Sequence, residues 1–460
     1  MKRLICIISL TLLVLSLPVV AGKPPGGGIV VTVSDTVVAK TPDYLGACEG
    51  GYWNVADLVD CGMRSCRFWV DMSRLEATDD DGVYGLPTIA EIKANPGIIP
   101  WAVWDQRFND PANWPMNEGV SVVPAQVFAD CIANGIVPLI CIRVKDIHAG
   151  PAWTPNPPYT QADLNEIWEY CFALAYWLNV RHNYGIFEWQ AWNEPDRSSQ
   201  GWTGTDYDYA NQFVKTMYDA VSYANSLASP AVPVWMHVGN SPGWSPMNAA
   251  FDYADAESQV ADYHYYRSSQ TSQAQNCFGQ VQAHNPDGLL EPLWNSEWGT
   301  YRQSYTTYNQ AIVVADDLYE FAMFDTTVGD HLRGSSIFIM WNWGAPDNGL
   351  VNDGVRTVTY YAHRIMNRSL NGYKDIMQTT GASGQFAVTR DAAKIYVTVL
   401  CSGSTYTVNL SALGITNTTA TLYYWNSSYN DQIVANPAVT NGQVTFTGLS
   451  DGAAVLVVPR

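Results

Sequence analysis

Residues 187–196 read Phe-Glu-Trp-Gln-Ala-Trp-Asn-Glu-Pro-Asp, an aromatic-rich run that ends in a glutamate followed by a proline. Aromatic residues favour a pleated backbone, and Trp189 and Ala191 alternate with polar side chains, so we predict a short buried strand. Proline cannot donate to a β-ladder and biases the residue before it toward an extended conformation, which places Glu194 at the carboxyl end of this strand. Barrel enzymes carry catalytic groups at that end. An ordinary polar turn is the alternative.

A second run, residues 293–299, reads Leu-Trp-Asn-Ser-Glu-Trp-Gly and again delivers a glutamate, Glu297, after apolar and aromatic residues. The interval from Glu194 to Glu297 accommodates three strand–helix units of roughly 30 residues each. The two glutamates would then end the fourth and seventh strands of an eight-unit barrel. Retaining glycosidases need two such carboxyl groups, one as proton donor and one as nucleophile.

The motif at residues 192–195, Trp-Asn-Glu-Pro, together with the later Ser296-Glu297, resembles the clan A glycoside hydrolases. The likeness covers most of residues 40–370. Within the clan the chain is most similar to the β-xylosidase and α-L-iduronidase family, with the arabinofuranosidase and cellulase-like families as neighbours. The resemblance implies a (β/α)8 barrel in which Glu194 is the acid/base and Glu297 is the nucleophile. Because several families share Asn-Glu-Pro, the motif specifies the clan and not the substrate.

The same resemblance implies five substrate-binding residues. Arg67 matches the arginine that keeps the nucleophile ionised, and Asn193 matches the amide that holds the 2-hydroxyl of the sugar. His264 and Tyr266 fit the His-x-Tyr pattern of the sixth strand, where the phenol donates to the nucleophile. Trp341, or a second tryptophan two residues further on, would form the floor of the subsite that binds the cleaved sugar.

The chain divides into a signal segment and two domains. From residue 44 to residue 371, apolar strand segments alternate with helical ones, which predicts an α/β (β/α)8 TIM barrel. The predicted strands are residues 45–48, 63–70, 137–142, 186–192, 232–238, 261–265, 289–296 and 336–341, and the predicted helices are residues 161–180, 206–226, 308–324 and 357–369. Residues 372–460 are rich in threonine, valine, tyrosine, asparagine and glycine and predict a C-terminal antiparallel β-sandwich. Residues 23–43 are a leader and a strand that we expect to join this sandwich. We interpret the sandwich as a structural support for the barrel in preference to a glycan-binding module.

Residues 1–22 have a basic start, an apolar run and small residues at its end, which predicts a secretory signal peptide. A membrane anchor is the less favoured alternative, because the apolar run is about 17 residues, at the short limit of spanning length. We therefore expect a secreted or periplasmic protein with no membrane contact after cleavage. A net charge of −19 disfavours nucleic acid and polyanionic glycans as partners.

The chain has nine cysteines, one of them inside the signal segment, and no pair has zinc-ligand spacing. We therefore predict no metal and no cofactor. Several cysteines lie in apolar runs, where the thiol behaves as a small hydrophobe, so we expect mostly buried thiols with room for one disulfide. Residues 71–123 lack periodicity, and long structureless loops are usually functional. Trp101, Trp104 and Trp114 in this segment are either sugar-stacking platforms or anchors of the loop.

Together these observations predict a secreted retaining glycoside hydrolase that cleaves β-glycosidic bonds in neutral polysaccharides or oligosaccharides by double displacement. The tryptophan-rich segment favours endo action. The alternatives are an exo-acting β-xylosidase or α-L-arabinofuranosidase, and a non-catalytic glycan-binding protein. The partner is a carbohydrate substrate, and the sequence leaves the oligomeric state open.

Overall fold

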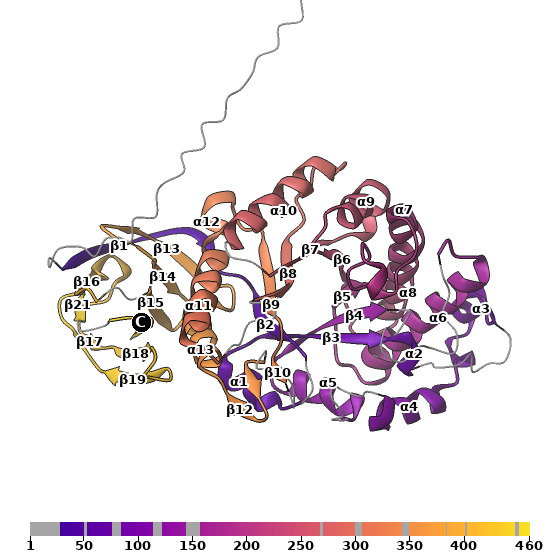
Figure 1. The fold of residues 1–460 in the computed structure, drawn as a ribbon, viewed down its shortest axis with the longest axis horizontal. Coiled ribbons are helices and arrows are strands. Elements are labelled where there is room, and N and C mark those ends of the chain that lie inside the picture. Colours follow the sequence, from indigo (N-terminus) through magenta and orange to yellow (C-terminus); the bar gives the residue numbers. More distant parts are fainter. Residues whose placement is uncertain are drawn as a thin grey trace, which may run out of the picture.

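The computed structural model describes residues 28–49, 53–75, 84–113, 122–143, 157–266, 270–299, 306–342, 349–382, 384–400, 403–446 and 450–460. Eight parallel strands close into a barrel (Figure 1). They are β2 (Tyr44–Cys48), β3 (Ser65–Asp71), β4 (Val137–Arg143), β5 (Glu188–Ala191), β6 (Trp235–Ser241), β7 (Val260–Tyr265), β8 (Leu293–Trp298) and β9 (Leu332–Ile337). The predicted (β/α)8 barrel is confirmed.

Helices cover the outside of the barrel (Figure 1). They are α1 (Val55–Cys61), α2 (Met72–Leu75), α3 (Ile89–Ala94), α4 (Trp101–Asn109), α5 (Pro124–Ala133), α6 (Gln161–Tyr176), α7 (Asp206–Asp208), α8 (Lys215–Ser226), α9 (Ser245–Ala254), α10 (Gln270–His284), α11 (Tyr308–Met323), α12 (Asp325–Val328) and α13 (Val358–Leu370). Helix α6 begins where Thr160 and Asp163 form a reciprocal capping box, and this satisfies amides that have no partner within the helix. The helix ends in a π-helical turn at Trp177–Arg181.

The prediction of a structureless segment over residues 71–123 is wrong, because three of the helices, α2, α3 and α4, lie within it. Trp104 on α4 is fully buried against Phe108, and the ring of Trp101 stacks on Tyr176 of α6 at 4.7 Å between centroids. These two tryptophans anchor α4 to the barrel and are not sugar platforms. Trp114 lies outside the described residues.

The second domain is built on a nine-stranded sheet in the order β19-β18-β22-β15-β14-β13-β1-β16-β21. Figure 1 shows the indigo strand β1 lying along β13, so the start of the described chain belongs to this sheet. The strands are β1 (Ile29–Lys40), β13 (Asp375–Thr380), β14 (Phe386–Arg390), β15 (Lys394–Leu400), β16 (Tyr406–Asn409), β18 (Thr421–Trp425), β19 (Gln432–Ala435), β21 (Gln443–Phe446) and β22 (Ala453–Pro459). Buried valines, isoleucines and aromatic residues form its separate core. The predicted sandwich is confirmed.

Three small ladders complete the strands. Near the barrel, β10 (Trp341–Asn342) pairs with β11 (Val351–Asn352), which pairs with β12 (Val355–Arg356). In the sandwich, β17 (Thr418–Thr419) pairs with β20 (Ala438–Val439). No described helix is long and apolar enough to cross a bilayer, and residues 1–22 lie outside the described residues.

The domains meet through α13. The carboxylate of Asp431, which follows β18, is fully buried and pairs with Arg368 Nη2 at 2.8 Å and with Arg364 Nε at 3.1 Å. The guanidinium of Arg368 also lies 3.9 Å from the ring centroid of Tyr423 on β18. These contacts fix the sandwich against the outer face of one barrel helix.

All described cysteines are buried thiols: Cys48, Cys61, Cys66, Cys131, Cys141, Cys171 and Cys277. This agrees with the expectation of thiols that pack as small apolar side chains. Burial raises the pKa of the Cys66 and Cys277 thiols well above the ordinary value, so these side chains stay uncharged.

Candidate active site

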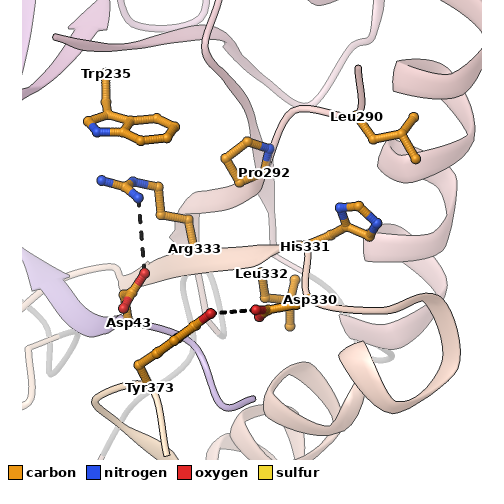
Figure 2. A pocket seen from close by; sticks show the side chains of 9 residues that line it. All are labelled: Asp43, Trp235, Leu290, Pro292, Asp330, His331, Leu332, Arg333 and Tyr373. Atoms are coloured by element: carbon orange, nitrogen blue, oxygen red, sulfur yellow. Dashed lines mark hydrogen bonds and ion pairs between the residues drawn. The ribbon is translucent and has the colours of Figure 1, made fainter. Parts of the chain in front are cut away.

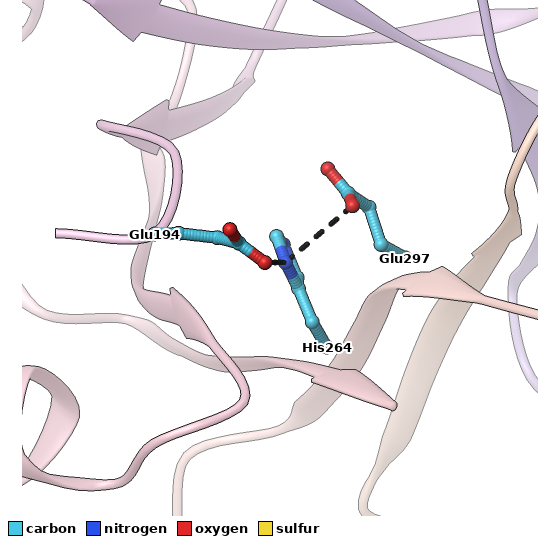
Figure 3. Close-up of side chains that lie close together, drawn as sticks. All are labelled: Glu194, His264 and Glu297. Carbon is cyan, nitrogen blue, oxygen red and sulfur yellow. Dashed lines mark hydrogen bonds and ion pairs between the residues drawn. The ribbon is translucent and has the colours of Figure 1, made fainter. Parts of the chain in front are cut away.

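Most of the sequence-predicted site residues meet at the carboxyl ends of the barrel strands. Arg67 lies on β3, Glu194 follows β5, His264 lies on β7 and Glu297 lies on β8. In the β7–β8 pairing a register shift places His264 opposite Glu297. Figure 3 shows the imidazole of His264 between the two carboxylates. The closed barrel thus brings together groups from four strands at the end where such enzymes act.

One imidazole nitrogen bridges the two glutamates. His264 Nδ1 lies 3.2 Å from Glu194 Oε1 and 3.6 Å from Glu297 Oε2 (Figure 3). A carboxylate oxygen of each glutamate and a ring nitrogen of the histidine all lie within 4.8 Å of one another. All three side chains are buried, so their charges interact with little screening by water.

Glu297 is surrounded by donors. Arg67 Nη1 lies 2.5 Å from Glu297 Oε1, and the phenol of Tyr266 donates to Oε2. Burial alone would raise the pKa of Glu297, but the charges of His264 and Arg67 and the hydrogen bonds from Tyr266 and Arg67 outweigh it and hold the pKa below its ordinary value. The carboxylate of Glu297 is therefore ionised in the resting site. This is the state that a nucleophile requires.

The backbone around Glu194 is unusual. Trp192 and Glu194 have positive φ angles of 64° and 49°, which non-glycine residues seldom adopt. The buried Asn240 on β6 holds this shape, because its Nδ2 donates to the carbonyls of Ala191 (2.6 Å) and Trp192 (2.9 Å). The Glu194 amide in turn donates to the Asn240 carbonyl at 2.9 Å. Residues held in sparsely populated conformations cluster at functional sites.

Asn193 and Glu194 each meet an additional polar partner. Asn193 Oδ1 accepts from Arg67 Nη2 at 2.7 Å and from Trp69 Nε1 at 3.3 Å, and its amide donates to Gln200. The half-exposed Arg197 lies 3.2 Å from Glu194 Oε2. Arg67 therefore orients both Glu297 and the residue that precedes Glu194.

Trp341 contacts residues at the start of α1. Its ring lies 5.3 Å from that of Trp53 and its Nε1 donates to Asp57 Oδ2 on α1 at 3.2 Å, so its role as the floor of a subsite stays a prediction. The ring centroid of Phe338 lies 6.0 Å from those of Trp69 and Tyr266, and Tyr266 contacts Glu297. The last barrel strand was predicted at residues 336–341 but ends at Ile337 as part of β9. The second tryptophan considered for the floor lies outside the described residues.

Two clusters of the described residues offer metal-ligand atoms. One is Glu194, His264 and Glu297, and the other is the more exposed set Asp255, Asp287 and Glu291. In the first cluster the two oxygens of Glu297 already accept hydrogen bonds from Arg67 and Tyr266. A guanidinium is also a poor neighbour for a second cation. The first cluster is therefore better suited to carboxylate chemistry than to metal binding.

The sequence interpretation missed a polar network inside the barrel. Gln190, His237 and Asp262 are fully or almost fully buried, although barrel interiors are usually filled by branched apolar residues. The signal was present, since each of these residues has an apolar or aromatic neighbour on either side of it in its strand. Such a position faces the barrel axis.

A cavity of about 320 Å³ lies at the opposite end of the barrel (Figure 2). Trp235 and Leu332 in its wall are the first residues of β6 and β9, so the cavity opens at the amino end of the strands. Figure 2 shows Arg333 between Trp235 and Asp43. The guanidinium of Arg333 lies 4.0 Å from a Trp235 ring centroid. Catalytic groups of barrel enzymes lie at the other end.

Comparison with known proteins gives structural matches only. No protein-family model matches the chain, and neither does a curated protein. Among solved structures, a GH30 endoxylanase from Clostridium papyrosolvens C71 is 14% identical with a TM-score of 0.62, covering 94% of this chain and 100% of its own. A glucosidase from Croceicoccus marinus is 13% identical with a TM-score of 0.63, and the match covers 93% of this chain and 98% of the glucosidase. A GH39 β-xylosidase from Caulobacter crescentus is 13% identical with a TM-score of 0.59, and the match covers 94% of this chain and 100% of the xylosidase. The chain therefore has the fold of these glycoside hydrolases, an eight-stranded barrel with an attached β-sandwich.

Proposed function

We propose that the protein is a retaining glycoside hydrolase that cleaves β-glycosidic bonds by double displacement. The observation that carries this proposal is the separation of the two carboxylates, whose facing oxygens lie within 4.8 Å. Retaining enzymes hold their carboxyl groups about 5–5.5 Å apart, whereas inverting enzymes leave about 6.5–9.5 Å for a water molecule. The separation favours direct attack by one carboxylate.

The environment of each glutamate supports its role. In the first step, Glu297 attacks the anomeric carbon while Glu194 gives its proton to the glycosidic oxygen, so that the bond to the leaving group breaks as the bond to Glu297 forms. In the second step, Glu194 takes a proton from water, which attacks the same carbon and releases Glu297. Arg67 and Tyr266 contact Glu297 and favour its ionised form at the start and end of the cycle. The bridging His264 lies within reach of both carboxylates.

We further propose a neutral glycan as the substrate. The net charge of −19 repels polyanionic chains, and the endoxylanase and the β-xylosidase with this fold act, by name, on xylan or xylosides. Endo action and a secreted or periplasmic location remain part of this proposal. Exo action on xylosides or arabinofuranosides is the second candidate, because a β-xylosidase and an α-L-arabinofuranosidase also have this fold, each with a TM-score of 0.59. The two glutamates with their buried partners weigh against a non-catalytic glycan-binding protein.

Azide rescue tests the two roles. A screen of aryl glycosides identifies a substrate, and then Glu297→Ala and Glu194→Ala are assayed with external azide. Glu194→Ala should cleave substrates with poor leaving groups about 10²–10⁴-fold more slowly than wild type, and substrates with activated phenols should lose less. Its product with azide should be the glycosyl azide of retained configuration. Glu297→Ala should lose activity on both and give the inverted azide. Glu91→Ala, an exposed glutamate on α3, is the control and should keep full activity.

Three results would contradict the proposal or part of it. If the azide products had the opposite configurations, the roles of Glu194 and Glu297 would be exchanged. If the wild-type protein released the inverted sugar as its first product, the retaining mechanism would be wrong. Inactivity on every glycoside, with binding to polymeric glycans intact, would favour the non-catalytic alternative.

A further inference from the structure

The interior of the barrel holds a continuous line of hydrogen-bonded polar side chains beneath the two glutamates. Arg67 Nε donates to Gln190 Oε1 at 2.5 Å. Gln190 Nε2 donates to Asp262 Oδ2 at 2.7 Å and to Ser296 Oγ at 2.8 Å. Because both protons of the Gln190 amide are used in this way, its oxygen is directed at Arg67. The line therefore sets the orientation of the guanidinium that contacts Glu297.

His237 on β6 continues the line toward the other end of the barrel. Its Nδ1 lies 3.0 Å from Asp262 Oδ2 and its Nε2 lies 2.9 Å from Glu188 Oε2. The side chains of His237, Glu188 and Asp262 have no exposed surface or almost none. The ring thus links two carboxylates that come from the strands on either side of its own.

The partners of His237 define which atoms carry protons. Glu188 Oε1 accepts from Arg333 Nε at 2.8 Å, and Asp262 Oδ1 accepts from the Ser296 amide at 3.2 Å. Each carboxylate therefore accepts from other donors, as an ionised group does. Between two ionised carboxylates, which only accept, both ring nitrogens donate, and this is the hydrogen-bonding pattern of a doubly protonated imidazolium.

The balance of charge immediately around the ring agrees with this assignment. Glu188 and Asp262 supply two negative charges, and Arg333, which contacts Glu188, supplies one positive charge. A neutral imidazole would leave one buried negative charge without compensation, which is costly in a medium of low polarity. A protonated His237 makes the two sums equal.

We infer that His237 is an imidazolium at neutral pH and a positioning residue for the candidate nucleophile, acting through Asp262, Gln190 and Arg67 on Glu297. The inference rests on the proposed function of Glu297. Burial lowers the pKa of His237, but the hydrogen bonds to Asp262 and Glu188 outweigh burial and raise it above the ordinary value.

A pH dependence follows from this charge. Because the pKa of His237 is raised in the folded protein, its contribution to stability is complete below the ordinary histidine pKa of about 6.5 and is lost as the pH rises through the folded value. The charged groups around the ring are Glu188 on β5, Asp262 on β7 and, behind Glu188, Arg333 on β9. The ring of Trp294 on β8 lies edge-on at 5.0 Å and is neutral. We expect Arg67 to lose its fixed orientation when His237 loses its proton.

Nitrogen NMR of the wild-type protein, labelled at its histidine side chains, tests the charge. At pH about 8, where an ordinary histidine with a pKa of about 6.5 is neutral, both ring nitrogens of His237 should still carry protons. The resonance is assigned by its absence from His237→Asn. A proton on only one nitrogen would overturn the inference. This measurement does not depend on activity, so it separates a failure of this inference from a failure of the proposed function.

Two substitutions test the positioning role. The amide nitrogen of His237→Asn replaces Nδ1 and keeps a donor for Asp262, whereas that of His237→Gln replaces Nε2 and keeps a donor for Glu188. If His237 acts through Asp262, His237→Gln should lower kcat by up to about 10²-fold at nearly constant KM, and His237→Asn should lower it much less. Equal losses in kcat would refute the positioning role. If both variants fail to fold, the positioning role is tested on the wild-type protein. Its kcat should fall over the pH range in which NMR shows His237 losing its proton. Full activity above that range would refute the role.

Discussion

Replacing Arg67 with methionine should destabilise the protein strongly, by an amount that depends on pH. The Arg67 side chain is fully buried and donates to Glu297 at 2.5 Å, to Gln190 at 2.5 Å and to Asn193 at 2.7 Å. Methionine has a similar length but offers no donor. The substitution therefore leaves the carboxylate of Glu297 buried without its nearest cation.

The magnitude follows from that uncompensated charge. Removing one partner of a buried ion pair typically costs about 3–5 kcal/mol, so we expect Arg67→Met to lower the free energy of unfolding by about that amount at neutral pH. The matched control is Arg181→Met. Arg181 also forms an ion pair, with Asp105 at 2.7 Å, but its side chain is 32% exposed, and exposed pairs contribute about 0–1 kcal/mol.

The sign of the pH effect gives a second check. The pKa of Glu297 is lowered in the folded protein, so the stability that its ionised form contributes is present above the ordinary pKa of about 4.3 and is lost as the pH falls through the folded value. Without Arg67, Glu297 should become protonated at a higher pH, and a protonated Glu297 needs no cation. The difference between wild type and Arg67→Met should therefore shrink toward acidic pH.

Denaturant unfolding followed by tryptophan fluorescence, at neutral pH and at about pH 4, measures both effects. A loss in Arg67→Met no greater than that in Arg181→Met would show that Arg67 does not compensate a buried charge. A loss that grew as the pH fell would refute the assignment of Glu297 as the ionised partner.

Two further outcomes are expected. Asp431→Ala should lower the free energy of unfolding by roughly 1.5–3 kcal/mol, because it removes the buried acceptor of Arg364 and Arg368. The control Asp35→Ala, at an exposed ion pair, should change it by less than about 1 kcal/mol. Thermal unfolding measures both variants, and equal effects would contradict the buried role of Asp431. Treatment with EDTA should leave the rate of glycoside cleavage unchanged, because the oxygens of Glu297 already accept from protein donors, and a loss that an added divalent cation restores would contradict this.

The sequence was sufficient for the features that depend on local pattern. The alternation in residues 187–191 and the proline at position 195 predicted where β5 ends, and the apolar face behind Thr160 predicted α6. Glu194 and Glu297 were paired because similar runs precede them. Their carboxylates meet in the structure because each follows or ends a strand of the same closed barrel.

The remaining features depend on contacts between strands that are distant in sequence. Glu188 and His237 are 49 residues apart, and each alone looks like an interruption of an apolar strand. Their pairing needs a closed barrel, which no short window of sequence contains. The end of β9 was misplaced for a related reason. Arg333 and Ser335 belong to the strand even though they are polar, so the prediction began too late, at Ser336, and ran on into the apolar residues that follow Ile337.

The position of β1 has a consequence for the synthesis of the chain. β1 is the first described strand to be made, yet Lys40 pairs with Asp375, which is 335 residues later, and β16 on its other side comes later still. At about 5–20 residues per second, β1 waits for roughly 20–70 s before either neighbour exists. An unpaired strand edge is a template for association between chains during that time. β1 thus joins β13 to β16 within one sheet, and removing β1 would leave the facing edges of both strands without a partner.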